Sequence, residues 1–261
     1  MKKLEADGVD AVENPKSLVD WFDAHNHGGS ARKLYLSAIK YFAKDKFPAV
    51  LQEMINELYQ AQNKKDLEQV LSKKQQENFV KWNDILAVQK QLAEMAEKTE
   101  IQWKQFVVAS LYTLNSPVRA DYGEMKVFPR ANAKRTGNEL IWNKKPVFVF
   151  RNYKTAKTYG AVTLPISGAL VRVLKQWFDH LGGVPEYLLG SPTNDKLFAV
   201  FVANTFKKYT GKDVGVSLLR HSYITHIFPS LKTIQQKEDV ARRMLHSRDL
   251  QEKYLSLQDM E

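Results

Sequence analysis

Arg220 occupies a position where a charged side chain is not expected. In the stretch SLLRHSYITHIF it precedes Ile224 by four residues and Phe228 by eight, so on a helix it shares their apolar stripe. A guanidinium group in such a place needs an anionic partner. The partner is either a carboxylate of this chain, which would make Arg220 structural, or an anionic ligand held at a site.

A second arginine also lies where helix electrostatics do not favour it. The Ser-Pro pair at 116–117 predicts a short helix over residues 118–124. Arg119 would lie in its first turn, where the helix dipole favours acidic residues. Asp121 and Glu124 are near enough in sequence to neutralise it, so a local ion pair is the structural alternative.

His246 and Tyr254 have ordinary explanations when each is considered alone. His246 follows a predicted helix over residues 232–245, where a histidine can act as a C-terminal cap. Tyr254 lies in a predicted helix over residues 250–257, at the spacing of a core aromatic. The order of all four residues along the chain carries more information than any one of them.

In that order, and with a lysine in the turn KTAKT, the chain resembles the tyrosine recombinase (integrase) family over about residues 76–261. The stretch LYTLNSPVRADY, which carries Arg119, is closest to the PPR-x-DY variant found in integrase-like genes of large DNA viruses and their mobile elements. The stretch NYKTAKTYG is similar to the family's lysine-bearing β-turn and offers Lys154 and Lys157.

The two C-terminal boxes each depart from the family pattern at one position. SLLRHS keeps Arg220 and His221 of a His-x-x-Arg-His box but has Ser217 where the family usually has histidine. LHSRDLQEKY keeps the histidine and the tyrosine of the last box, with Leu245 in place of the usual glycine. The missing histidine concerns one proton-handling contact, so Ser217 and His221 are kept as additional site candidates.

The resemblance implies breakage and rejoining of DNA strands. Tyr254 would attack the scissile phosphate to form a 3′-phosphotyrosyl link, while Arg119 and Arg220 hold the nonbridging oxygens. His246 would add a hydrogen bond to the same phosphate. Lys154, with the second lysine of its turn as the alternative, would protonate the departing 5′-oxygen. The implied chemistry uses no metal ion and no cofactor.

The elements that would position these residues are mainly helical. Beyond the helices already named, apolar residues recur three and four positions apart in five longer stretches, predicting helices over residues 78–96, 100–114, 169–181, 199–209 and 217–228. The segments MKVF, ELIWN, PVFVFRNYK and YGAVTLPI are short and rich in Val, Phe, Ile and Thr. They predict a small antiparallel β-sheet, so the expected fold class is α+β with mainly α content.

Three regions are expected along the chain. Residues 1–15 are polar and predict a flexible leader. Residues 16–74 form a small basic helical unit, with helices near 50–59 and 65–70, which ends at the plausible linker KKQQEN. By the resemblance, this unit is a core-binding domain that closes a clamp on DNA, and residues 76–261 are the catalytic domain.

Composition favours a nucleic-acid partner. The net charge is +10 and the pI is near 9.5, as expected of a protein that binds a polyanion. The absence of cysteine excludes disulfides, thiolate zinc sites and cysteine nucleophiles. No apolar run is long enough to span a membrane. We therefore expect a soluble intracellular protein. The resemblance further implies that it binds double-stranded DNA and self-associates on it, in the nucleus, cytoplasm or viral factory where the target DNA is.

Two other functions fit the same residues. A type IB topoisomerase uses similar arginine, lysine, histidine and tyrosine chemistry but relaxes supercoils as a monomer, and Ser217 keeps this alternative open. A non-catalytic DNA-binding protein could use the helices between residues 217 and 245 as a helix-turn-helix, with Tyr254 as a core residue.

Overall fold

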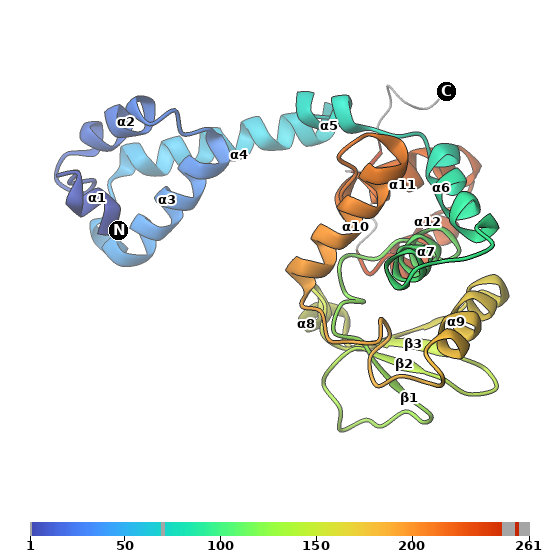
Figure 1. Cartoon of the computed structure of the whole chain (residues 1–261). Helices are drawn as coiled ribbons and strands as arrows, with labels where there is room; N and C mark the ends of the chain where they lie inside the picture. The colour runs from blue at the N-terminus through green and yellow to red at the C-terminus, as the bar shows by residue number, and fades with distance from the viewer. Residues whose placement is uncertain (1, 69–70, 247–253, 256–261) are drawn as a thin grey trace. The chain divides into compact units, whose positions relative to one another are not determined.

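The computed structural model describes residues 2–68, 71–246 and 254–255. The chain divides into two compact units, Met1–Glu68 and Gln69–Glu261. Among the described residues, none of the helices has both the length and the apolar character required to cross a membrane. Helices predominate and a small sheet lies in the second unit, which confirms the predicted α+β class (Figure 1).

The first unit is helical, with the elements α1 (Lys2–Ala6), α2 (Pro15–Ala24), α3 (Gly29–Ala43), the 3-10 helix η1 (Lys44–Lys46) and α4 (Ala49–Glu68). The leader expected over residues 1–15 is not free, because α1 forms there and Leu4 is buried with Leu18 and Phe22. The two helices expected near 50–59 and 65–70 belong to one continuous helix, α4, as far as Glu68.

The second unit is built around α7 (Glu100–Thr113), in which every residue from Gln105 to Tyr112 is buried. The segment KKQQEN is a short helix rather than a linker, because Ser72 and Gln75 form a capping box at its start. The other helices of the unit are α5 (Lys73–Asn78), α6 (Trp82–Glu94), α8 (Ala156–Tyr159), α9 (Gly168–His180), α10 (Asp195–Thr210), α11 (Val216–Ile227), the 3-10 helix η2 (Phe228–Ser230) and α12 (Ile234–Arg243).

The sheet contains the four predicted strands in the order β1 (Lys126–Phe128), β2 (Glu139–Ile141), β3 (Val147–Phe150) and β4 (Val162–Pro165). The pairs β2–β3 and β3–β4 are antiparallel, but β1 and β2 are parallel, so the sheet is mixed and the expectation of a purely antiparallel sheet was wrong. The connection over residues 129–138 is long enough to return to the start of β1, which a tight hairpin would not do.

Residues 118–124 are irregular, with a turn over residues 121–124, and do not form the predicted short helix. Side chains from elsewhere take carbonyls that a helix would use internally. Tyr112 Oη donates to the carbonyl of Arg119 at 2.8 Å, and Asn138 Nδ2 donates to that of Asp121 at 3.0 Å. Because of this, Arg119 is held by long-range contacts rather than by a helix of its own.

Candidate active site

Arg220 is fully buried on α11 and lies against the end of α12. Its Nη1 donates to the carbonyls of Met244 at 3.0 Å and Pro117 at 3.4 Å. Its Nε and Nη2 have no hydrogen-bond partner among the described residues, and no carboxylate of that part of the chain forms an ion pair with it. Burial lowers the pKa of Arg220 from its usual value. The described structure therefore leaves this guanidinium without the internal anion that a structural role would require.

The end of α12 is shaped by Leu245, whose φ is +55° in the left-handed region. The amide of His246 donates to Ala241 O and that of Leu245 donates to Arg242 O, both at 3.1 Å, which is the hydrogen-bond pattern of a Schellman motif. Glycine is the residue that usually meets this backbone requirement. Leu245 adopts the same conformation while its side chain is buried, so the departure from the family pattern leaves the turn intact.

The same turn brings the second arginine to the site. Arg119 Nη1 donates to Leu245 O at 3.3 Å, next to the carbonyl that Arg220 contacts. No ion pair joins Arg119 to Asp121, Glu124 or any other carboxylate in the described residues, so the local-ion-pair alternative has no support there. Two guanidinium groups are thus bound to consecutive carbonyls with nitrogen atoms left for an anion.

His246 is buried beside these two arginines. Burial, followed by the charges of Arg220 and Arg119, lowers its pKa to about 3. Its two ring nitrogens have no partner within the described part of the chain. It also lines a cavity of about 460 Å³ with Tyr153 and Arg242. At neutral pH His246 is therefore an uncharged imidazole that can donate one hydrogen bond to a ligand.

Tyr254 lies over this group. Its ring centre is 4.7 Å from the guanidinium carbon of Arg220, 5.6 Å from the ring centre of His246 and 4.8 Å from that of His221. His221 Nδ1 donates to the Tyr254 carbonyl at 2.8 Å, and burial lowers the pKa of His221 to about 4. The structure thus places His221 where it fixes the backbone of Tyr254.

The turn KTAKT meets the site through the residue between its lysines. Thr155 Oγ1 donates to Leu245 O at 3.3 Å, the carbonyl that Arg119 also contacts. Lys154 and Lys157 are both exposed. Lys154 was expected at the end of a strand, but β3 ends at Phe150 and Lys154 lies in a turn, whereas Lys157 is in the one-turn helix α8.

Ser217 and the predicted helix over residues 250–257 are the remaining features that the sequence led us to expect. Ser217 is exposed in the first turn of α11, three residues before the buried Arg220. The predicted helix over residues 250–257 lies outside the described residues, apart from Tyr254 and Leu255. Ser217 therefore remains a candidate by sequence only.

Asp121 was considered only as an ion-pair partner of Arg119, and the structure gives it a different environment. Its side chain is 7% exposed and its Oδ2 has no hydrogen-bond partner among the described residues. Burial, and then the charge of Asp195, raises its pKa to about 6, while Arg119 and Arg220 act in the opposite direction. The sequence signal that could have indicated this burial is the aromatic residue Tyr122 directly after Asp121.

No protein-family model matches this chain, and no curated protein matches it in sequence. Among solved structures, the crystal structure of XerA recombinase is similar to it, with a TM-score of 0.48 and 10% sequence identity. The similarity covers 91% of this chain and 83% of that one. At this TM-score and identity the similarity carries no argument about function, which has to come from the geometry of the site.

Proposed function

We propose that this chain is a tyrosine recombinase that cleaves and rejoins DNA through a 3′-phosphotyrosyl intermediate on Tyr254. The supporting observation is the buried guanidinium of Arg220, which has two unsatisfied nitrogen atoms and no carboxylate partner in the described structure and lies 4.7 Å from the Tyr254 ring. A phosphate group has the charge and the acceptor geometry that such a guanidinium requires.

In the proposed cleavage step, the Tyr254 oxygen forms a bond to phosphorus as the bond from phosphorus to the 5′-oxygen breaks. The tyrosine gives up its proton to solvent water, and the leaving oxygen takes one from Lys154. Arg119 and Arg220 stabilise the charge on the nonbridging oxygens, and His246 donates a hydrogen bond to one of them. In rejoining, a 5′-hydroxyl attacks the phosphotyrosyl bond, so the energy of the phosphodiester is conserved.

The partner in this proposal is double-stranded DNA, bound by several copies of the chain together. The net charge of +10 favours such a polyanion. In the first unit, which we propose to be the core-binding domain, Lys33, Lys40 and Lys44 lie on or next to α3 and are suited to contact backbone phosphates. In the second unit Lys207 and Lys208, in the last turn of α10, are suited to the same role.

The direct test is covalent trapping on a nicked suicide duplex from which the cleaved fragment dissociates. The wild-type protein should give a covalent protein–DNA band, and Tyr254→Phe should bind DNA with unchanged affinity but give no band. The matched controls are Tyr223→Phe and Tyr209→Phe, whose hydroxyls bond to Ser116 and Gln105, and both should keep the band. A band that persists in Tyr254→Phe would refute the assignment of the nucleophile.

The same reagents separate the two other functions. A non-catalytic DNA-binding protein would give no band with wild-type protein. A type IB topoisomerase would give the band and would relax supercoiled plasmid without exchanging strands between two duplexes. A recombinase gives the band and joins strands from different duplexes.

A further inference from the structure

Asn138, at the end of the β1–β2 connection, uses the whole hydrogen-bonding capacity of its side-chain amide. Nδ2 donates to the carbonyls of Asp121 at 3.0 Å and Asn152 at 2.8 Å. Oδ1 accepts from the amides of Arg151 and Asn152, both at 2.9 Å. Two donors and two lone pairs are all that an asparagine amide has, and every one is used on backbone groups.

These four bonds connect two segments that are distant in sequence. Asp121 follows Arg119 by two residues, and Arg151 and Asn152 lead directly into Tyr153 and Lys154. One amide therefore ties the turn of the first arginine to the turn of the proposed general acid. Among the described residues, no other side chain forms hydrogen bonds both to the backbone of the Arg119 turn and to the backbone that leads to Lys154.

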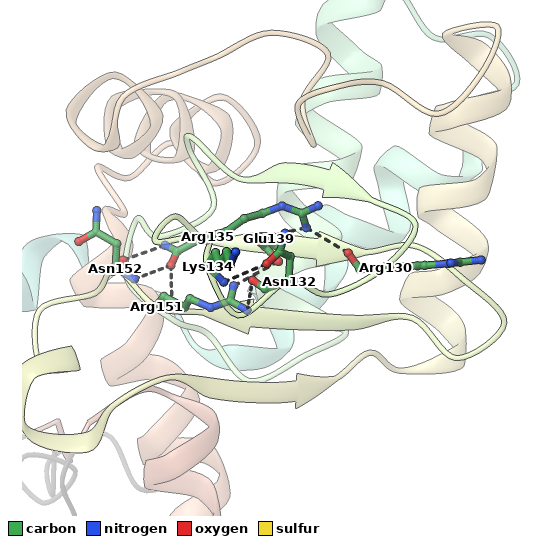
Figure 2. A network of polar contacts seen from close by, with 8 residues as sticks. Arg130, Asn132, Lys134, Arg135, Glu139, Arg151 and Asn152 are labelled. Carbon is green, nitrogen blue, oxygen red and sulfur yellow. Dashed lines mark hydrogen bonds and ion pairs between the residues drawn. The ribbon is translucent and has the colours of Figure 1, made fainter.

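Ion pairs of Glu139, in β2, also hold the segment that contains Arg151. The buried carboxylate of Glu139 lies 3.1 Å from Arg151 Nη1 and 3.6 Å from Arg135 Nη1. Arg151 Nη2 also donates to the carbonyl of Asn132 at 3.4 Å. Figure 2 shows Arg135, Glu139, Arg151 and Asn152 gathered beside the strands. Asn138 thus acts within a braced network and is not an isolated surface amide.

The two neighbours of Lys154 in the chain are held by other contacts. Tyr153 is buried and its Oη donates to Gly160 O at 2.8 Å, while Thr155 Oγ1 donates to Leu245 O. The backbone at Lys154 is therefore fixed on both sides, by Asn138 and the buried Tyr153 before it and by Thr155 after it. Because the Lys154 side chain is exposed, its position is defined only if the backbone is held both before and after this residue.

We propose that Asn138 is a positioning residue that holds the Lys154 turn in register with Arg119, so that Lys154 reaches the departing 5′-oxygen. This inference rests on the proposed function. Without the amide, Arg119 is still held by the bond from Tyr112 Oη to its carbonyl and by the bond from its Nη1 to Leu245 O, whereas the Lys154 turn loses one of its anchors. The expected defect is therefore confined to protonation of the leaving group.

The test is single-turnover cleavage by Asn138→Ala of two suicide duplexes that differ only at the bridging 5′-atom, which is oxygen in one and sulfur in the other. A thiolate leaves without needing a proton, so sulfur removes the need for the general acid. On the oxygen substrate the variant should be slower than wild type by about 100-fold. On the sulfur substrate it should be within about threefold of wild type, the range of an indirect effect.

The matched control is Asn143→Ala, an exposed asparagine of the same sheet whose side chain accepts only from the amide of Lys145 in the β2–β3 turn. It should cleave both substrates at the wild-type rate. Asn138→Asp is the second variant. The aspartate side chain keeps the shape of asparagine and can accept from the amides of Arg151 and Asn152, but an ionised carboxylate cannot donate to the carbonyl of Asp121 or to that of Asn152. It should reproduce the selective loss on oxygen if Asn138→Ala does not fold. In a Lys154→Ala background, Asn138→Ala should slow oxygen cleavage by no more than about threefold.

The outcomes separate this inference from the function beneath it. If wild-type protein forms no adduct on either substrate, the proposed function fails whatever Asn138 does. If wild type cleaves both but Asn138→Ala is equally slow on both, Asn138 has only a general structural role and the inference is overturned. An unimpaired Asn138→Ala, or losses that multiply fully with those of Lys154→Ala, overturns it as well.

Discussion

The guanidinium carbon of Arg220 lies 4.7 Å from the centre of the Tyr254 ring. This cation–π contact joins the proposed nucleophile to a proposed phosphate clamp. It also means that the ring covers a guanidinium that is fully buried and has no carboxylate partner in the described residues. We therefore propose that this arginine serves a ligand, and the alternative is that it serves the stability of the fold.

Replacing Arg220 by methionine separates these two explanations. Arg220→Met removes a buried charge that has no ion-pair partner but leaves the carbonyls of Met244 and Pro117 without their donor, so the free energy of unfolding should fall by no more than about 2 kcal/mol. Cleavage of the suicide duplex should fall by about 1000-fold, because charge stabilisation in the transition state is lost. Urea unfolding and single-turnover cleavage measure the two effects. A loss of about 3 kcal/mol or more, with activity lost only in proportion, would show that Arg220 belongs to a structural ion pair.

Leu245 predicts an unusual order of stabilities. Its φ of +55° strains any residue except glycine, whereas its buried side chain contributes packing. Leu245→Ala loses the packing and keeps the strain, at a cost of about 3 kcal/mol. Leu245→Gly loses the packing but relieves about 1 kcal/mol of strain, so glycine should be more stable than alanine here. Chemical denaturation of the three proteins checks the order Leu, Gly, Ala. An alanine variant more stable than the glycine variant would contradict it.

The sequence located the parts of this structure that depend on local pattern. The helices predicted over residues 100–114 and 217–228 match α7 and α11 closely in their bounds, although burial in both helices extends beyond a single apolar face. The segment after Pro117 was predicted as a helix from its local sequence. The helix does not form because Tyr112 and Asn138 bond to its carbonyls, and these residues are distant in the sequence. Helix propensity depends on the local sequence and does not include such long-range contacts.

The candidate site shows the same division. Motif order identified Arg119, Arg220, His246 and Tyr254, and the structure places these four around the end of α12. Asn138 was not among the site candidates, because its four bonds are formed with segments that the sheet brings together. The parallel pairing of β1 with β2 was missed for a related reason, since strand direction depends on the path of the connection.

The buried ionisable groups predict how stability depends on pH. The folded-state pKa values of His246 and His221 are about 3 and about 4, below their ordinary value of 6.5, so the unfolded chain binds more protons as the pH falls below 6.5. These histidines therefore reduce stability with falling pH. Asp121 acts in the opposite direction between about pH 6 and 4, because its pKa is raised to about 6 from 3.8 and the folded protein keeps its proton.

The two histidines lower the free energy of unfolding as the pH falls, and Asp121 raises it. Together these three residues should lower it by about 1 kcal/mol for each pH unit between pH 6 and 4.5. Asp121→Asn removes the opposing contribution and should steepen the dependence by about the same amount. Urea unfolding of both proteins across this range measures the difference, in which all other titrating groups cancel. Equal slopes for the two proteins would contradict the raised pKa of Asp121.

The choice between Lys154 and Lys157 as general acid can be tested by the same atom replacement at the leaving group. The backbone at Lys154 is bounded by the buried Tyr153 and by Thr155, which contacts Leu245 O, whereas Lys157 lies in the single turn of α8 beside the exposed Thr158. A proton is delivered reproducibly only from a defined position, so these contacts favour Lys154.

Lys154→Ala should therefore cleave ordinary DNA slowly and recover most of its rate when the bridging 5′-oxygen is replaced by sulfur. Lys157→Ala should lose at most a modest amount of rate, equally on both substrates, because a lysine that only contacts a backbone phosphate affects binding whichever atom leaves. Single-turnover cleavage of both substrates at saturating protein gives the four rates needed. Recovery by sulfur in Lys157→Ala alone would move the general acid to that residue. Recovery in neither variant would mean that the proton comes from outside this turn.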